Sequence, residues 1–303
     1  GSAFESFLGW NYFTGAIVGF FIVLTYIFTG GFIAVAWSDL FQGVIMLICL
    51  VMLPIVAMLS IDPNESIIVG VQALDPNLLS IWGEGGFNTL NLITVLGFML
   101  IGLGFLGSPQ LFVRFMSIKD QNEIKKGRWV AFAFTILTDS CAVLIGIYGR
   151  YILTDIGSSP EEVLGKGGQN VLPLLVENLM PLFLIGLYIA AVLSAIMSTI
   201  DSLLVVASSA ISRDFYQQIF KPNKTEKQLA NISKMITLLL ALIALTIAMS
   251  VALLLPERTI FWFVIFGWSG IAATFCPTII LSLFWDKFTE KGAICSMIAG
   301  FLC

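Results

Sequence analysis

The octapeptide Ala195–Ser202, Ala-Ile-Met-Ser-Thr-Ile-Asp-Ser, lies inside a long apolar run that extends from about residue 180 to residue 211. On a helix its first, fourth, fifth and eighth residues share one face, because they are spaced by three, four and seven positions. Polar and ionisable side chains at the depth of a bilayer are rare, and by default they mark an ion or substrate path. This face therefore presents a row of oxygen atoms inside a membrane.

Two interpretations of this face stay open from the residues alone. Sodium and other hard cations are held by clusters of carbonyl, hydroxyl and carboxylate oxygens, so the face suits an ion. Small residues spaced by four, as in Ser194, Ser198 and Ser202, equally let membrane helices pack closely. Hydroxyls in helices also often bond back to a carbonyl one turn earlier. Asp201 favours the ion, because a buried carboxylate is costly unless something neutralises it.

The composition is that of a polytopic membrane protein. The chain has 303 residues, of which 58% are hydrophobic and 11% are charged, and its mean hydropathy is +0.98. Soluble domains carry about 25% charged residues. The sequence contains no basic patch with interleaved aromatic residues, so nucleic acid is not an expected partner.

Histidine is absent from the sequence, which removes His-assisted nucleophiles and histidine metal ligands. We therefore expect no catalytic residues and no enzymatic activity. The cysteines are odd in number, widely spaced and set in apolar runs, which predicts buried thiols and neither disulfides nor a metal site. They are Cys49, Cys141, Cys276, Cys295 and Cys303.

Apolar runs long enough to cross a bilayer follow one another along the chain. In lipid every backbone polar group must be bonded internally, so these continuous runs predict helices and not the alternating strands of an outer-membrane barrel. The last run stops after 12 residues, whereas a span needs roughly 20. We therefore expect a fragment of a longer protein that forms one transmembrane domain over residues 1–303. The runs cover about 9–29, 31–59, 91–117, 129–153, 180–211, 231–255 and 259–285, with an eighth from 292.

The positive charges predict the orientation of these spans. Lysine and arginine concentrate in cytoplasmic loops, and here twelve of fifteen follow the third, fifth and seventh runs. The N-terminus and the loops 60–90 and 154–179 are then expected outside, with room for short helices over an entrance. The twelve are Arg114, Lys119, Lys125, Lys126, Arg128, Arg213, Lys221, Lys224, Lys227, Lys234, Lys287 and Lys291; the other three are Arg150, Lys166 and Arg258.

Three carboxylates, those of Asp39, Asp139 and Asp201, lie within apolar runs, and no lysine or arginine lies deep in any run. A buried carboxylate must be protonated, hydrogen-bonded or neutralised by a cation that comes and goes. We expect a functional role for Asp39. For Asp139, which has Thr138 and Ser140 as neighbours, we expect a structural, hydrogen-bonded role.

The third run is interrupted by Gly-Leu-Gly-Phe-Leu-Gly-Ser-Pro-Gln at residues 102–110. Three glycines and a proline in nine residues predict a helix that breaks partway through the membrane, where its backbone lines a cavity. Many secondary transporters build their substrate site at such a break. A simple proline kink is the alternative. In the seventh run, the small and aromatic residues from Phe266 to Pro277 fit either a gate or a close-packed seam.

Several motifs in order along the chain resemble the sodium:solute symporter family, and most closely its sodium/proline branch. The motifs are Gly-Gly-Phe-Ile-Ala-Val-Ala-Trp-Ser-Asp at 30–39, Gly-Leu-Gly-Phe-Leu-Gly-Ser-Pro at 102–109 leading to Arg114-Phe115-Met116, Leu193–Ser202 followed by Ala207–Ala210, and Trp268-Ser-Gly270 leading to Pro277. The resemblance covers almost the whole chain. It implies an all-α, LeuT-like fold of two inverted five-helix repeats, of which this chain holds core helices four to ten and the start of the eleventh.

The resemblance also implies where sodium binds. The ligands that the family's eighth core helix gives to the main sodium site fall on the backbone carbonyl of Ala195 and the hydroxyls of Ser198 and Thr199. Some members have a second sodium site. Its positions fall on Asp39, Ser198, Asp201 and Ser202.

In the family the solute sits beside the broken sixth core helix, which implies contacts with Ile101, Phe105 and Pro109. Proline transporters of the family carry tryptophan at the position of Ile101 and tyrosine at that of Phe105. The phenol hydroxyl is therefore lost here, while a ring remains against which an apolar solute can pack. The family's first core helix, which supplies further sodium and solute contacts, is not expected in this chain.

These observations predict a multi-pass protein of the plasma membrane, a bacterial inner membrane, that couples sodium entry to uptake of a small organic solute. Proline or a related amino acid is the first expectation. We expect sodium to be co-transported and the protein to be embedded in a lipid bilayer. The sequence does not specify an oligomeric state. Two alternatives stay open: the same fold coupled to protons through Asp39 or Asp201, and a transporter-like input domain of a membrane sensor kinase.

Overall fold

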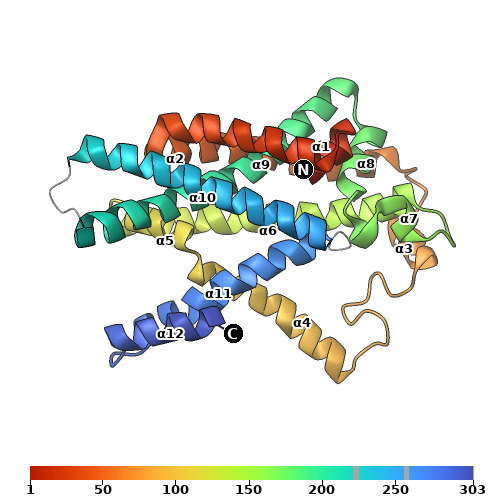
Figure 1. The fold of residues 1–303 in the computed structure, drawn as a ribbon. Coiled ribbons are helices and arrows are strands. Elements are labelled where there is room, and N and C mark those ends of the chain that lie inside the picture. The colour runs from red at the N-terminus through yellow and green to blue at the C-terminus, as the bar shows by residue number, and fades with distance from the viewer. Residues whose placement is uncertain (221–224, 256–258, 303) are drawn as a thin grey trace. The chain divides into compact units, whose positions relative to one another are not determined.

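The part of the chain that the structure describes is helical and contains no strand (Figure 1). The computed structural model describes residues 1–220, 225–255 and 259–302, except for the side chains of residues 26, 28–34 and 226. The all-α fold class is confirmed. The helices are α1 (Ser2–Leu8), α2 (Tyr12–Ser60), α3 (Ile67–Leu74), α4 (Thr89–Ile101), η1 (Gly102–Gly107), α5 (Pro109–Met116), α6 (Gln121–Leu153), α7 (Pro160–Leu164), η2 (Lys166–Gly168), α8 (Val171–Leu179), α9 (Leu182–Ser209), η3 (Ala210–Phe220), α10 (Glu226–Leu254), α11 (Ile260–Phe284) and α12 (Glu290–Leu302).

Some features named from the sequence lie outside the described residues. They are the side chains of the Gly-Gly-Phe-Ile-Ala segment at 30–34, the cations Lys221, Lys224 and Arg258, and Cys303.

The first two apolar runs belong to one helical element, α2, and not to two separate helices as expected. Within α2 the stretch Val35–Ser60 is long and apolar enough to cross a membrane by itself. The described stretch Tyr12–Thr25 and α1 together form a further candidate span, and the two helices are bent by 113°. The two runs meet at Gly30 and Gly31 without a proline, and glycine weakens a helix but does not force it to end there.

The later apolar runs are confirmed as helices. With Val35–Ser60 they make six candidate spans among the described residues, or seven if the bent pair is counted as one span. The other five are Thr89–Gly107, Gln121–Leu153, Leu182–Phe220, Lys227–Leu254 and Ile260–Phe284. α12, at the predicted eighth run, has 13 residues. The loops expected to hold short helices contain α3 in one case, and α7, η2 and α8 in the other.

The chain divides into two compact units. The first unit comprises Gly1–Ile61, Phe132–Tyr148 and Asn170–Glu257, and the second comprises Asp62–Ala131, Gly149–Gln169 and Arg258–Cys303. Helix α6 therefore contributes its middle to the first unit and its two ends to the second.

In the first unit α2 packs against α9, and α9 packs against α10. The buried residues Cys49, Leu53 and Ala57 of α2 recur every four positions and form one face of that helix. On α9, Tyr188 and Ala191 are buried as well. Lipid offers no hydrophobic driving force between helices, so the small side chains among these, such as Ala57 and Ala191, favour association by allowing close van der Waals contact.

The cysteines follow the prediction with one exception. Cys49, Cys141 and Cys276 are buried free thiols, but Cys295 is exposed. The prediction was wrong for Cys295 because α12 buries none of its residues. A position inside an apolar run is therefore not enough to predict a buried thiol.

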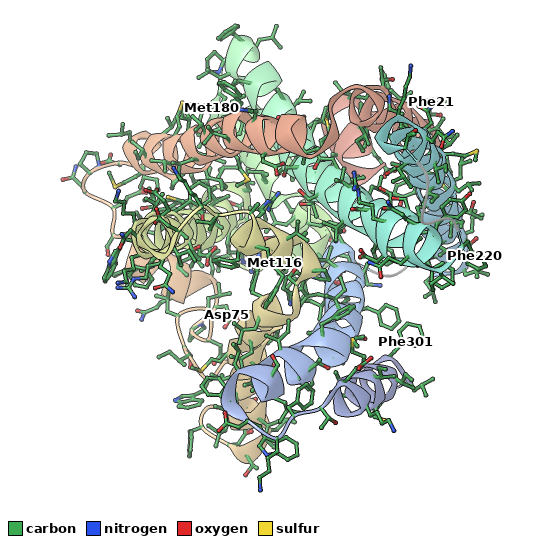
Figure 2. All side chains as sticks on the ribbon, turned by 90° about the vertical axis from the view of Figure 1, so that its left-hand side faces the viewer. Phe21, Asp75, Met116, Met180, Phe220 and Phe301 are labelled. Atoms are coloured by element: carbon green, nitrogen blue, oxygen red, sulfur yellow. The ribbon has the colours of Figure 1, made fainter. Side chains whose placement is uncertain are left out.

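Large apolar side chains cover the outside of the helices (Figure 2). Met99, Phe220 and Phe284, which lie on candidate spans, are each at least 60% exposed. In water, such a surface would mark a binding site or an aggregation liability. On spanning helices it is the surface that faces lipid, which agrees with a multi-pass membrane protein.

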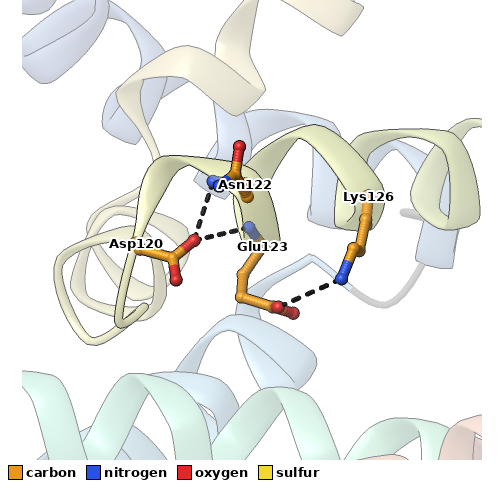
Figure 3. Close-up of polar contacts among 4 residues, drawn as sticks. All are labelled: Asp120, Asn122, Glu123 and Lys126. Carbon is orange, nitrogen blue, oxygen red and sulfur yellow. Dashed lines mark hydrogen bonds and ion pairs between the residues drawn. The ribbon is translucent and has the colours of Figure 1, made fainter.

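Helix α6 begins at a hydrogen-bonded cap (Figure 3). The carboxylate of Asp120 accepts hydrogen bonds from the backbone N–H groups of Asn122 (2.8 Å) and Glu123 (3.0 Å). Two of the donors that a helix N-terminus leaves unpaired are thereby satisfied. The following ion pair, Glu123 to Lys126 at 3.4 Å, is exposed and contributes at most about 1 kcal/mol. The cap therefore determines where this long helix starts.

Candidate ion and solute sites

Three oxygen atoms expected to bind sodium lie together on α9, in the first unit. The hydroxyls of Ser198 and Thr199 donate to the backbone carbonyl of Ala195, at 3.0 Å and 3.2 Å. These hydrogen bonds to a carbonyl one helical turn earlier bring the three oxygen atoms together. A carbonyl has two lone pairs and each hydroxyl oxygen keeps its own acceptor capacity, so all three atoms can still ligate a cation.

The residues expected at the second ion site are brought together from α2 and α9. The Ser202 hydroxyl donates toward Oδ2 of Asp39 at 3.3 Å and toward Oδ1 of Asp201 at 3.4 Å. Asp201 is fully buried and Ser202 is 6% exposed. One hydroxyl proton serves one acceptor at a time, and two carboxylates that share it repel each other when both are ionised. This cluster therefore favours an added positive charge, from either a cation or a proton.

A buried hydrogen bond joins the same two helices. The Tyr188 hydroxyl donates to the backbone carbonyl of Cys49 at 2.7 Å, and both residues are 2% exposed. Tyr188 lies seven positions before Ala195 and hence on the same face of α9 as the row of oxygens. The sequence reasoning missed Tyr188. The available signal was a phenol inside an apolar run, where its hydroxyl needs a partner.

A cavity of about 450 Å³ lies in the first unit, between segments of α2 and α9. Chain neighbours of Asp39 and Ser198 form part of its wall, which is lined by Ile22, Thr25, Ser38, Gln42 and Met197. The side-chain oxygen of Gln42 is buried and accepts no hydrogen bond from a described residue. Gln42 was also missed, although it lies three positions after Asp39 and so near it on one side of α2.

The structural, hydrogen-bonded role expected for Asp139 is not found among the described residues. It is exposed on α6, and its side chain forms no hydrogen bond with a described residue. Its neighbour Thr138 is 8% exposed and donates to the carbonyls of Phe134 (2.9 Å) and Thr135 (3.1 Å). Successive residues of a helix point about 100° apart, so the buried side of α6 here carries Thr138 and not Asp139.

The third apolar run is broken, as predicted, in the second unit. Helix α4 ends at Ile101, Gly102–Gly107 continues as the 3-10 helix η1, and Ser108 is extended (φ −80°, ψ 109°) before α5 begins at Pro109. Proline suits the first position of a helix because the N–H that it lacks would be unpaired there in any case. The break is confirmed, and the alternative of a simple kink is excluded.

The expected solute contacts follow one another at four-residue spacing across this break. Ile101 ends α4, Phe105 lies in η1 and Pro109 starts α5. The Phe105 side chain is 57% exposed, and its ring centroid lies 4.6 Å from that of Trp268 on α11. The indole Nε1 of Trp268 donates to the backbone carbonyl of Ile101 at 3.3 Å. Trp268 therefore contacts two of the three expected residues.

Polar side-chain atoms near the break and on α11 are buried without a hydrogen-bond partner among the described residues. They are Ser108 Oγ, Gln110 Oε1 and Thr278 Oγ1. An unpaired buried hydroxyl or amide costs about 1–3 kcal/mol, so these atoms are candidates for contact with a polar group of a solute or with water. The motif 102–110 contains Ser108 and Gln110. Nothing in the local sequence marks Thr278, since the burial of its hydroxyl depends on tertiary packing.

The two sets of residues belong to different units. Ala195, Ser198 and Thr199 lie in the first unit with Asp39, Asp201 and Ser202, and the solute residues Ile101, Phe105 and Pro109 lie in the second. Among the described residues, no group of three or more Cys, Asp or Glu side chains gathers as a metal site. The donors that do gather are oxygens, which suit a hard cation such as sodium better than a transition metal.

Comparison with known proteins agrees with the family resemblance found in the sequence motifs. A family model described as the sodium:solute symporter family matches residues 1–300. The high-affinity proline transporter PutP of Bacillus subtilis (strain 168) is 33% identical over 300 residues, which is 99% of this chain and 60% of that protein. The osmoregulated proline transporter OpuE of the same organism is 33% identical over 99% of this chain and 58% of its own length. A sodium/proline symporter of Staphylococcus aureus is 35% identical over 100% of this chain and 57% of its own length.

The fold is similar to that of a solved Na+-coupled sialic acid symporter in a substrate-bound, outward-open state. The TM-score is 0.65 at 18% sequence identity, and the match covers 99% of this chain and 68% of that one. This likeness concerns the fold alone, and it confirms the expected LeuT-like class. The chain spans about 57–60% of the length of the curated relatives that it matches.

Proposed function

The chain belongs to the sodium:solute symporter family, and from this premise we propose that the natural protein that contains it, here called the parent protein, couples sodium entry to the uptake of a small organic solute. Members of this family are transporters and not enzymes. The chain itself is a multi-pass protein of the plasma membrane. We propose that both units belong to one transport domain.

The observation that carries this proposal is the cluster of Asp39, Asp201 and Ser202. Two carboxylates beside one hydroxyl, with Asp201 fully buried, are a strong attraction for a small cation. We assign one sodium ion to this cluster. A second is assigned to Ala195, Ser198 and Thr199, because the two hydroxyl oxygens lie 3.0 Å and 3.2 Å from the carbonyl oxygen of Ala195. Oxygen is the donor atom that hard cations prefer.

The proposed solute is proline or a related amino acid. Three of the relatives compared above are named as proline transporters or symporters. Ile101 and Phe105 offer apolar surface to the ring of such a solute, and the buried hydroxyl of Ser108 is available for its polar end. Pro109 keeps the backbone broken at this point, which exposes peptide groups that a continuous helix would hide.

Coupling follows from linkage. If sodium and solute both bind more tightly to the same outward-open conformation, each raises the affinity of the other by the same factor. The inward sodium gradient then drives solute uptake through alternating access. Nothing in this scheme requires a contact between the two ligands, only a shared preference for one conformation.

Two other functions are less well supported. A proton can occupy the Asp39 cluster, which would make the same fold proton-coupled. A sensor kinase input domain would use the fold without transport. The family and the relatives with sodium in their names do not favour either.

The test is uptake of radiolabelled proline by the parent protein in cells that lack their own proline carriers, with sodium or choline in the buffer. We expect saturable uptake in sodium and none in choline. Uptake that persists in choline and collapses with the pH gradient would show that protons, and not sodium ions, drive transport. Failure of proline and of a panel of other small solutes, with the protein present at the cell surface, would refute the proposal.

A further inference from the structure

The break in the third apolar run leaves backbone carbonyls that an uninterrupted α-helix would have paired. Two donors from α11 approach carbonyls of this segment. The indole N–H of Trp268 donates to Ile101, and the thiol of Cys276 donates to Leu103, each at 3.3 Å. The donors are eight positions apart, so they lie about 12 Å apart along the helix axis. Helix α11 therefore contacts the broken segment at two separate points.

Two glycines make this close approach feasible. A Cβ atom at Gly104 would lie 2.5 Å from Nε1 of Trp268, and one at Gly107 would lie 2.7 Å from the backbone N of Cys276. Both distances are too short for a real side chain, so any residue other than glycine would push α11 away from η1. Gly104 thus faces the indole N–H of Trp268 and Gly107 faces the backbone of Cys276, and the four residues form a single contact surface.

The same contact reaches the residues proposed to bind the solute. The Trp268 ring packs on the ring of Phe105 at a centroid distance of 4.6 Å, with 59° between the planes. Phe105 is 57% exposed, and an exposed side chain that must be ordered on binding lowers affinity through lost entropy. A ring already held by Trp268 has lost that freedom before the solute arrives.

We propose that Trp268 and Cys276 are positioning residues for the solute: they hold the broken segment in place and order the Phe105 ring beforehand. This inference rests on the proposed function, because it assumes that a small amino acid with an apolar ring or chain binds at the break. Neither residue belongs to the proposed sodium sites. Their replacement is therefore expected to change solute affinity and to leave sodium binding measured without solute unchanged.

The first test is Trp268→Phe in the parent protein, which keeps a ring for stacking and removes the N–H. We expect the proline concentration for half-maximal uptake to rise roughly fivefold, as for loss of one hydrogen bond. The maximal rate per transporter at the cell surface is expected to stay the same. Trp262→Phe is the matched control, because Trp262 lies on the same helix, is 55% exposed and donates no hydrogen bond to a described residue.

The second test compares Cys276→Ser with Cys276→Ala. Serine keeps a donor for the carbonyl of Leu103 and is expected to behave like the unaltered protein. Alanine loses the donor, and we expect a rise in half-saturation similar to that of Trp268→Phe. Cys295→Ala, at an exposed thiol of α12, is the control for cysteine removal as such. If the Cys276 side chain only filled space, serine and alanine would have similar effects. Normal half-saturation in Cys276→Ser but not in Cys276→Ala would therefore show that the hydrogen bond matters.

The unaltered parent protein is measured first, so that two kinds of failure are separated. If it shows no saturable, sodium-dependent uptake of proline or of another solute, the proposed function fails and this inference fails with it. If uptake is normal but Trp268→Phe and Cys276→Ala match their controls, the positioning role alone is overturned. The symporter proposal then stands.

Discussion

At the scale of single residues, the hydroxyls of α9 differ in how much they contribute to packing. Ser198 is half-buried and Ser202 is buried, whereas Thr199 is exposed although its hydroxyl bonds to the same carbonyl as that of Ser198. Removal of an exposed hydroxyl disturbs packing least. Thr199 is therefore the residue at which ion binding and helix packing are most easily separated.

Thr199→Ala is expected to raise the sodium concentration for half-maximal uptake roughly tenfold, because a charge-assisted contact is lost, without lowering expression. The measurement is a sodium titration of uptake by the parent protein. Thr246→Ala on α10 is the matched control, since its exposed hydroxyl makes the same kind of bond, to Leu242 at 2.8 Å. Equal sodium dependence of Thr199→Ala and the unaltered protein would contradict the assignment.

Asp39→Asn is expected to change the sodium stoichiometry or the apparent sodium affinity. The substitution removes one of the two carboxylates beside Ser202 and with it the repulsion that favours a bound cation. Parallel measurement of sodium and solute fluxes gives the stoichiometry. Asp139→Asn makes the same chemical change at an exposed position of α6 and is expected to have no effect. Identical sodium titration curves for the unaltered protein, Asp39→Asn and Asp139→Asn would show that Asp39 does not belong to the ion site.

At the scale of helices, the ion cluster depends on how α2 and α9 are aligned. Ser202 meets Asp39 only if the two helices keep one register, because a slip of one residue turns a helix by about 100°. The buried bond from Tyr188 to the carbonyl of Cys49 lies on the same face of α9. Tyr188 is therefore a residue through which packing of the first unit supports the cluster.

Tyr188→Phe is expected to lower the free energy of unfolding by about 0.5–1.5 kcal/mol, the usual net value of one hydrogen bond, with membrane proteins near the lower end. The readout is the thermal midpoint of the purified parent protein in detergent. Tyr148→Phe is the control, because Tyr148 is 8% exposed on α6 and forms no hydrogen bond with a described residue. A midpoint lowered equally by both changes would argue against the bond to Cys49.

At the scale of the whole molecule, the distribution of charge predicts the orientation in the membrane. The loop between α5 and α6 and the first turns of α6 carry several of the basic residues, and the loop that contains α3 carries none between residues 61 and 88. Basic loops stay on the cytoplasmic side. We therefore expect the short helix α3 to lie on the outer side of the membrane.

Labelling with a membrane-impermeant maleimide tests this orientation. In the parent protein without its native cysteines, Asn77→Cys is expected to react in right-side-out vesicles, and Lys125→Cys only in inverted ones. Both positions are exposed in the structure, so access from the correct side is the only difference. Labelling of Lys125→Cys from outside would reverse the predicted topology and the direction assigned to sodium entry.

The sequence by itself determined the helical class, the later spans and the break at residues 102–109. A bilayer forces every apolar run to bond its own backbone, and three glycines and a proline within nine residues break the helix at 102–110. These effects are local. The row of Ala195, Ser198 and Thr199 was predictable for the same reason, because their spacing alone places them on one side of α9.

Only the tertiary structure decided which residues of distant helices meet. Ser202 bonds to Asp39 across 163 positions, and Trp268 bonds to Ile101 across 167. In a soluble helix the apolar stripe shows which face packs, but a membrane helix is apolar on all sides and its sequence marks no such face. For this reason the local sequence predicts neither the buried bond of Tyr188 nor that Thr138, and not Asp139, lies on the buried side of α6.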